Sequence, residues 1–250
     1  MSAPSDSRHE LDTMVVNTTR WLPPEIFWCP ISVIETRSFQ LDLMIELTLV
    51  SIIQGVALFF LTDNARAVMS SRHWENLLYV AAGLCVIFIF WSRSIIHTLT
   101  LIRWPLEFGH NFFYIACALG EAILFSRLDR PLAWFQLSAA FAGVIWLLFI
   151  YDMRLIHART AESRNDTERV LYSRTKADQL LNIWLLVPLL FLLNLACTLA
   201  ICSRPDFFIA RAGHVWLIGA QLVSFAGYLL YVARFFRVIA PLVLRSRQAE

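Results

Sequence analysis

WPLEFGHNFFYIACALGEAILFS, residues 104–126, is an apolar stretch long enough to cross a bilayer, yet it carries several ionisable side chains. Ionisable groups inside a membrane span are costly and usually face other protein or a cavity. The polar residues follow one another in steps of three or four, which places them roughly on one face of a helix: Glu107, His110, Asn111, Tyr114, Cys117 and Glu121. The opposite face is apolar and suits lipid. The pattern therefore predicts a spanning helix whose polar face meets neighbouring helices.

The composition of the whole chain agrees with a membrane protein. Of its 250 residues 58% are hydrophobic and 16% charged, and the mean hydropathy is +0.60. A soluble domain of this length needs more polar surface to cover its core. The five Cys residues show no CxxC or Cys/His metal spacing and are interpreted as small buried hydrophobes.

Six apolar runs are each close to the length that a bilayer core requires. They predict an all-α, six-transmembrane-helix bundle with helices at about 39–62, 75–99, 104–126, 131–153, 179–202 and 213–240. The membrane domain thus covers residues 39–240, between a cytosolic or interfacial N-terminal segment (1–38) and a short tail (241–250). Pro188 inside the fifth run predicts a kink. Thr175 and Asp178 resemble a capping box that opens the fifth helix.

The distribution of Lys and Arg predicts the orientation. The N-terminal arm, the second and fourth connections and the C-terminal tail, counted together with Arg93, Arg234 and Arg237 at the adjoining helix ends, hold 15 of these 21 residues, and the other connections hold six. By the positive-inside rule we expect a multi-pass protein of the plasma (inner) membrane with both termini in the cytosol. The net charge of only +2 leaves no basic face for nucleic acid.

With this topology, polar residues gather toward the cytosolic side of the bundle, and the sparser outer half includes the acidic residues Glu121 and Asp63. Each has a structural interpretation as well as a functional one: a first-turn carboxylate is favoured by the helix dipole, an Arg can reach lipid headgroups, and Glu46 can pair with Arg93. The candidate layer comprises Asp42, Glu46, Arg93, His97, Glu107, His110, Asp152 and, in the outer half, Glu121.

Two functional hypotheses use this layer. In a pore, acidic residues of several subunits would draw cations to an apolar constriction. In a membrane-embedded enzyme or metal site, Glu107 and His110 would use the Glu-x-x-His spacing of di-metal helical bundles, although those bundles take the motif from two helices and this chain has one copy. No cofactor motif is visible, and we expect none.

The first two predicted helices resemble those of the lysosomal-type bacterial potassium channels. Arg37, Phe39 and Asp42 open the first helix, and FIFWSRSIIH, residues 88–97, closes the second. The resemblance implies a homo-oligomer whose cation pore is lined by apolar residues of the first helix, such as Ile45, Leu49 and Ile53.

The sequence analysis therefore predicts an oligomeric, channel-like protein permeable to cations. The alternative is a non-catalytic subunit or anchor of a larger complex, in which the N-terminal arm and the loop at 156–178 contact a cytosolic or membrane protein partner. An enzyme is the third hypothesis. The expected interaction partners of the chain are therefore the lipid bilayer, other copies of the chain and such a protein partner.

Overall fold

The computed structural model describes residues 31–70, 74–100, 108–163 and 165–248, and the side chains of 31–43, 46, 108, 247 and 248 lie outside the description. The chain divides into two units, Met1–Leu41 and Asp42–Glu250. In the first unit, the described residues form the beginning of a helix. The described residues are helical and contain no strand, which confirms the predicted all-α class for this part of the chain.

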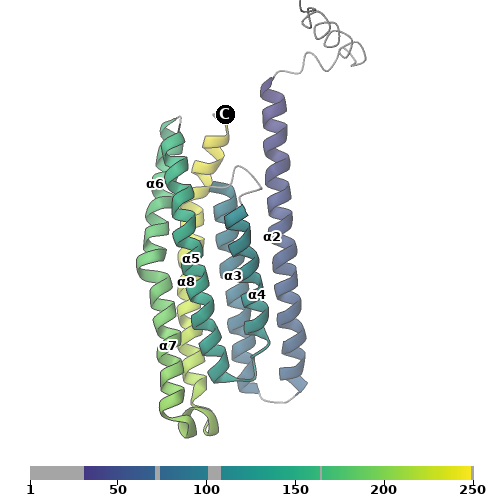
Figure 1. Cartoon of the computed structure of the whole chain (residues 1–250), viewed down its shortest axis with the longest axis vertical. Helices are drawn as coiled ribbons and strands as arrows, with labels where there is room; N and C mark the ends of the chain where they lie inside the picture. The colour runs from purple at the N-terminus through teal and green to yellow at the C-terminus, as the bar shows by residue number, and fades with distance from the viewer. Residues whose placement is uncertain (1–30, 71–73, 101–107, 164, 249–250) are drawn as a thin grey trace, which may run out of the picture. The chain divides into compact units, whose positions relative to one another are not determined.

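The α-helices of the described residues follow one another along the chain (Figure 1), and α2 begins in the first unit and continues into the second. They are α2 (Ile31–Ser70), α3 (Leu77–Thr100), α4 (Phe108–Phe125), α5 (Pro131–Glu162), α6 (Asp166–Leu181), α7 (Val187–Ser203) and α8 (His214–Gln248).

Five helical segments of the described residues are long and apolar enough to cross a membrane. They are Leu47–Ser70, Trp74–Thr100, Pro131–Glu162, Asp166–Ser203 and His214–Ser246, and Gly109–Phe125 is a shorter apolar helix. The chain is therefore compatible with a multi-pass membrane protein.

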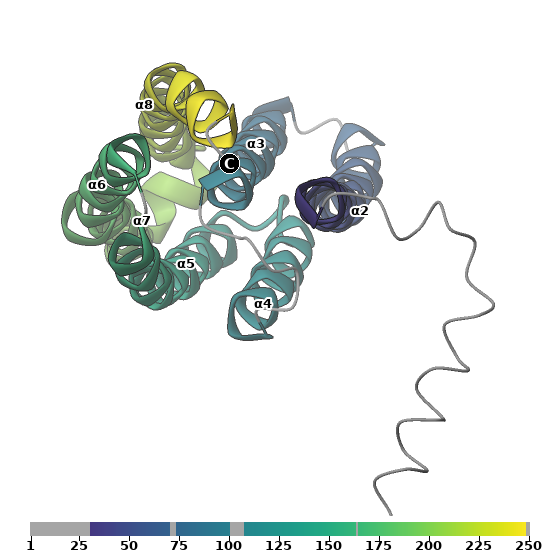
Figure 2. The same ribbon diagram turned by 90° about the horizontal axis from the view of Figure 1, so that it is seen from above.

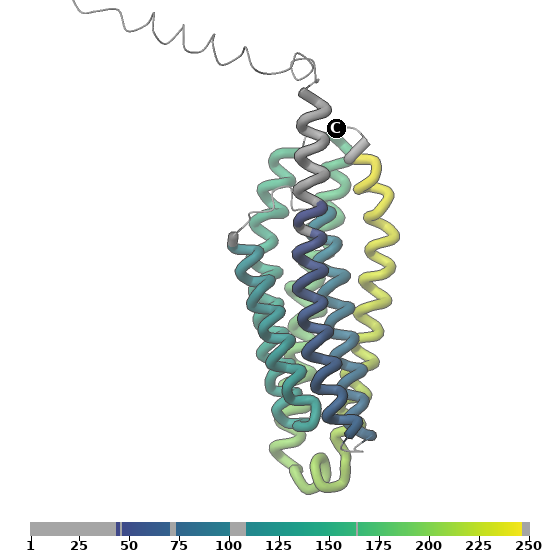
Figure 3. The backbone as a smooth tube through the Cα atoms, turned by 90° about the vertical axis from the view of Figure 1, so that its right-hand side faces the viewer, coloured from purple at the N-terminus to yellow at the C-terminus, as the bar shows by residue number. Residues whose placement is uncertain are grey.

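Within the second unit the long helices lie side by side (Figures 1 and 2). α3 packs along α8, and α5 packs along both α4 and α7. α2 lies in front of the other helices in Figure 3 and inserts Val50, Ala57 and Leu61 into the common core. The dispersion contacts of this buried apolar surface hold the helices together.

The best packed part of the core lies where α3 and α5 begin. Trp134, Tyr79 and Phe135 are fully buried, and the rings of Tyr79 and Trp134 meet edge to face with centroids 5.5 Å apart. Tyr79 also shares a hydrogen bond with Nδ1 of His214 at 3.0 Å. These contacts join the first turns of α3, α5 and α8.

Several helices extend beyond the apolar runs that predicted them. The run at 39–62 lies inside α2, which continues to Ser70, and the run at 131–153 lies inside α5, which continues to Glu162. A search for apolar runs finds only the residues that suit the hydrocarbon core of a bilayer. A helix can continue beyond them into water as long as its backbone hydrogen bonds are maintained. The polar segment at 156–178 is correspondingly helical, apart from the break between α5 and α6.

The predicted capping box at Thr175 and Asp178 is wrong. The helix begins earlier, at Asp166, and Asn165 is its N-cap, since its side chain accepts a hydrogen bond from the backbone N–H of Glu168 at 2.8 Å. Thr175 and Asp178 lie buried in the middle of the helix. Asn165 with an acidic residue three positions later satisfies the same pattern, and the polar flanking sequence obscured which copy starts the helix.

The region of Pro188 deviates from α-helical geometry, as the proline predicts. A π-helical turn, Asn182–Leu186, separates α6 from α7, and the backbone N–H of Val187 donates to the carbonyl of Asn182 five residues earlier. A proline ring crowds the carbonyl four residues before it, and the wider turn relieves this contact.

Gly83 allows α3 to approach α2 and α4. A Cβ atom there would lie 2.7 Å from Leu61 Cδ1 and 3.1 Å from Phe125 Cε1, whereas a Cβ at Gly143 of α5 would meet nothing within 4 Å. We expect Gly83→Val to destabilise the protein by about 1–3 kcal/mol through overpacking. Thermal unfolding in detergent measures this, with Gly143→Val as the matched control. Equal melting temperatures for both variants would contradict the packing.

Candidate functional site

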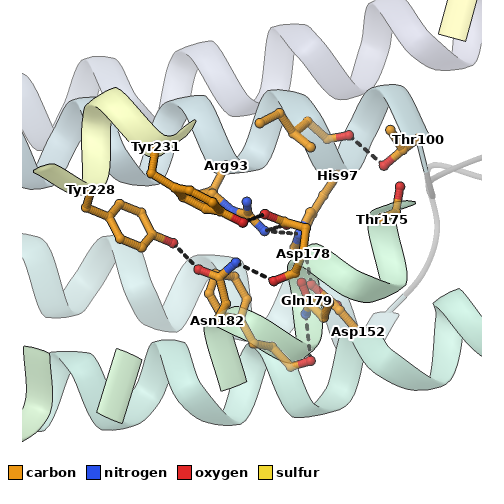
Figure 4. Close-up of polar contacts among 12 residues, drawn as sticks. Arg93, His97, Thr100, Asp152, Thr175, Asp178, Gln179, Asn182, Tyr228 and Tyr231 are labelled. Atoms are coloured by element: carbon orange, nitrogen blue, oxygen red, sulfur yellow. Dashed lines mark hydrogen bonds and ion pairs between the residues drawn. The ribbon is translucent and has the colours of Figure 1, made fainter. Parts of the chain in front are cut away.

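An ion pair joins α3 to α6 in the interior of the bundle (Figure 4). Nη2 of Arg93 donates to Oδ2 of Asp178 at 2.7 Å, and the two side chains are only 4% and 1% exposed. The guanidinium carbon also lies 5.2 Å from the centroid of the Phe149 ring on α5, a cation–π contact. A cation that would be expensive to bury alone is thereby stabilised from two helices.

A second charged group joins α3, α4 and α5. Nδ1 of His97 lies 3.0 Å from Oδ2 of Asp152, and Nδ1 of His110 lies 2.9 Å from Oδ1 of the same carboxylate. Asp152 is fully buried, and both histidines are almost so. The carboxylate of Asp152 is therefore in contact with two imidazole rings, one from α3 and one from α4.

A contact between the two groups defines the proton position on His97. Nη2 of Arg93 lies 3.4 Å from Nε2 of His97. A guanidinium can only donate, so Nε2 is the acceptor and the proton resides on Nδ1, the nitrogen that lies 3.0 Å from Oδ2 of Asp152. In this arrangement His97 is neutral.

The charges of the site do not balance by themselves. Arg93 contributes one positive charge and the carboxylates of Asp152 and Asp178 contribute two negative charges. Since His97 is neutral, one excess negative charge remains unless a proton resides on the pair of His110 and Asp152. An uncompensated charge in an apolar interior is strongly unfavourable, so this pair is suited to bind a proton.

Two tyrosines of α8 complete the polar contacts. The hydroxyl of Tyr231 donates to Oδ1 of Asp178, and the hydroxyl of Tyr228 donates to Oδ1 of Asn182 (Figure 4). Nδ2 of Asn182 in turn donates to the backbone carbonyl of Asp178 at 2.8 Å. We call the whole set the polar cluster: Arg93, His97, His110, Asp152, Asp178, Asn182, Tyr228 and Tyr231.

A cavity of about 50 Å³ adjoins the polar cluster. Its polar lining includes Arg93, His97, His110 and Tyr114, and most other lining residues are apolar. Nε and Nη1 of Arg93 are buried and have no hydrogen-bond partner among the described residues, so they are available to water. At about 10–15 Å³ for each water, the cavity has room for a few water molecules and for no larger organic ligand.

Half of the predicted layer belongs to the polar cluster: Arg93, His97, His110 and Asp152. Glu121 is buried elsewhere, further along α4. Glu107 and the side chains of Asp42 and Glu46 lie outside the described residues, so the suggested pair of Glu46 with Arg93 is not tested.

The apolar residues predicted to line a pore differ in their exposure. Ile45 and Leu49 are exposed on α2, at 55% and 38%, whereas Ile53 is half-buried against the core. The first two are therefore accessible to lipid or to another copy of the chain.

The sequence pattern places Asn182 near the cytosolic polar layer, at the start of the predicted fifth helix, but it does not select Asp178, Tyr228 and Tyr231 as site residues. The pattern predicts Asp178 as part of a helix cap, and the two tyrosines carry no charge and resemble ordinary membrane-helix residues. Their spacing contained a signal, since Asp178 and Asn182 are one turn apart, as are Tyr228 and Tyr231.

The described residues hold no group of three or more His, Cys, Asp and Glu arranged to bind a metal ion. In the polar cluster, His97 and His110 each point Nδ1 at a different oxygen of Asp152, so they are paired with the carboxylate. The predicted metal site at Glu107 and His110 includes a residue outside the description and stays a hypothesis.

A second buried polar network has a different character. Nε1 of Trp134 donates to Gln221 at 2.8 Å, Gln221 donates to Asn194 at 2.6 Å, and Asn194 donates to the carbonyl of Leu190 at 2.7 Å. Every side-chain polar atom of Trp134, Gln221 and Asn194 has a partner. Because all of its polar atoms are hydrogen-bonded, this network is interpreted as a structural one that fixes the packing of α5, α7 and α8.

The Arg93–Asp178 pair should be essential for stability. We expect Arg93→Leu to destabilise the protein by about 3–5 kcal/mol, because it leaves a buried carboxylate without its cation. The control is Arg159→Leu, which breaks an exposed pair with Glu162 (2.9 Å) and should cost less than about 1 kcal/mol. Thermal unfolding in detergent compares them. The double variant Arg93→Leu/Asp178→Leu should lose less than the sum of its single variants, and additive losses would refute the coupling.

Comparison with known proteins returned no relative for this chain. No protein-family model matches it, and neither a curated protein nor a solved structure does.

Proposed function

We propose that the protein crosses the plasma membrane six times, with both termini in the cytosol, and conducts cations as a channel-like protein. The five long apolar segments support the membrane location. α4, with 18 residues, is about 27 Å long, close to the thickness of the bilayer core, and supplies the sixth crossing. The excess of Lys and Arg in alternate connections supports the orientation.

The polar cluster is the observation that carries the functional proposal. It buries three formally charged side chains and two histidines among helices that are otherwise apolar. Each such group adds a cost to membrane insertion, and groups of this kind in membrane helices mark ion pathways. Stability alone does not require the arrangement, because apolar residues of similar volume serve packing equally well or better.

The sign of the charge supports cations over anions. Two carboxylates face one guanidinium, so the centre attracts positive charge and repels negative charge. The adjoining cavity of about 50 Å³ limits the permeant species to small ions and water.

Flux measurements in liposomes containing the purified protein test the proposal. Separate gradients of K⁺, Na⁺ and H⁺ are applied, and we expect flux of at least one cation above that of empty vesicles. Asp152→Asn should reduce this flux by about tenfold or more, since it removes the charge to which both histidines are paired. Glu162→Gln is the matched control, the same carboxyl-to-amide change at an exposed position of α5.

Absence of flux for all three cations would overturn the proposal. Native mass spectrometry of the same preparation then identifies what replaces it. A stable complex with a foreign protein, together with absent flux, would favour the membrane-subunit function. A homo-oligomer that conducts would support the channel.

A further inference from the structure

Glu121 is a buried acid that the polar cluster does not use. Its side chain on α4 is fully buried, and neither carboxyl oxygen has a hydrogen-bond partner among the described residues. An ionised carboxylate in such surroundings would be strongly destabilising. Glu121 is therefore held as the neutral acid, with a proton on one oxygen.

Two more incompletely bonded polar side chains lie beside Glu121. Gln54 of α2 is 6% exposed, and both atoms of its amide group lack a partner in the described part of the chain. Its amide lies near the carboxyl of Glu121 and near the buried hydroxyl of Tyr114, which Ser94 also adjoins. None of these contacts reaches hydrogen-bond geometry within the described part of the chain. Three neighbouring groups thus retain unused capacity to donate and accept, in contrast to the saturated Trp134–Gln221–Asn194 network.

This group connects to the polar cluster through Tyr114. The rings of Tyr114 and His110, one turn apart on α4, are stacked with centroids 6.3 Å apart. Both side chains line the cavity that also contacts Arg93. His110 lies two residues after the first residue of α4 and Glu121 four residues before its last, so the polar face spans about 16 Å along the helix axis.

We infer that the cation conducted is the proton, and that it moves along the polar face of α4 between the His110–Asp152 pair and Glu121. This inference rests on the proposed function and specifies its ion. The two ends of the path are the groups suited to hold a proton. Tyr114 and water in the cavity transfer the proton between them, and Gln54 is a positioning residue that orients the Glu121 carboxyl.

The geometry excludes a metal cation from this path. The rings of Phe90 and Tyr114, which both line the cavity, stack with centroids 4.8 Å apart, and Cys117 of α4 is fully buried. K⁺ or Na⁺ would need a shell of oxygen ligands to replace its water. A proton needs only hydrogen bonds that form in sequence, which hydroxyl, carboxyl and water groups provide.

The proposed transfer is balanced. The His110–Asp152 pair binds one proton from water at its end of α4. Tyr114 accepts one proton on its hydroxyl oxygen as it donates its own onward, so the hydroxyl is unchanged. Glu121 releases its proton to a water molecule on the side of the last residues of α4, which carries it away as hydronium, and takes up the proton that arrives from Tyr114. One proton enters, one leaves, and no oxidant or reductant takes part.

Charged and titratable groups lie near the path on α4 itself and on four other helices. They act on the protons through their charge or hydrogen bonds, and they are Arg93 and His97 of α3, Cys117 of α4, Asp152 of α5, Asp178 of α6, and Tyr228 and Tyr231 of α8.

Proton flux in liposomes tests the inference. A K⁺ gradient with valinomycin sets the membrane potential, and a pH-sensitive dye reports proton movement. We expect Glu121→Gln, which has the same shape without an acidic proton, to reduce proton flux by about tenfold or more. Tyr114→Phe, which keeps the ring on Phe90 and removes the hydroxyl, should also reduce it. Glu162→Gln should leave it unchanged. Elution volume and melting temperature verify the fold of each variant.

The outcomes separate this inference from the proposed function. Wild-type flux of K⁺ or Na⁺ without proton flux would overturn the inference and leave the cation channel standing. Proton flux that persists in folded Glu121→Gln and Tyr114→Phe would overturn the path alone. Absence of flux for every cation would overturn both.

Infrared spectroscopy tests the proton on Glu121 independently of flux. The wild-type protein should show the C=O stretching band of a protonated, buried carboxyl group, and Glu121→Gln should lack that band. If the wild type has no such band, the carboxyl is ionised and the inference fails. A purely structural role of Glu121 would predict the loss of the band in a folded Glu121→Gln variant without loss of proton flux.

Discussion

The carboxylate of Asp152 is buried in an apolar bundle, and the pairing that this requires sets the positions of the neighbouring helices. His97 from α3 and His110 from α4 both direct Nδ1 to it. Apolar surfaces tolerate sliding and rotation of one helix against another, because dispersion contacts have little direction. Charge-assisted hydrogen bonds do not tolerate it, so Asp152 and the Arg93–Asp178 pair specify the register of α3, α4, α5 and α6.

The buried polar groups of this protein fall into two kinds. The Trp134–Gln221–Asn194 network is saturated and lies among the best packed aromatic residues. Gln54, Tyr114 and Glu121 keep unpartnered atoms in the described structure, as does the guanidinium of Arg93. Unsatisfied buried groups lower stability, and a fold retains them where they serve chemistry that a saturated network cannot perform. Single unpartnered atoms also occur among the described residues at Ser138, Trp146 and Gln179, so the candidate pathway is distinguished by the clustering of Gln54, Tyr114 and Glu121.

The location of the pathway distinguishes the present proposal from the one suggested by resemblance to potassium channels. That resemblance implies a pore between subunits, lined by apolar residues of the first helix, and Ile45 and Leu49 are exposed on α2 in a way that leaves them accessible to another copy. The polar cluster and the polar face of α4, however, lie within one chain. In this arrangement, each copy in an oligomer would contain its own pathway, and the copies would not form one shared pore between them.

The sequence by itself determined the helical class, the apolar runs and the presence of costly charges within them, because hydropathy and helical period are local properties. It also selected Arg93, His97, His110 and Asp152, since ionisable residues in membrane helices are conspicuous. Only the tertiary structure decided which charges pair, why Asp178 is a partner of Arg93 rather than a helix cap, and why two tyrosines of α8 belong to the same cluster. Such contacts join residues that are far apart in the sequence, and the partners of the Tyr79–His214 hydrogen bond are 135 positions apart. Their formation depends on the packing angles and registers of the helices, which no local sequence pattern encodes.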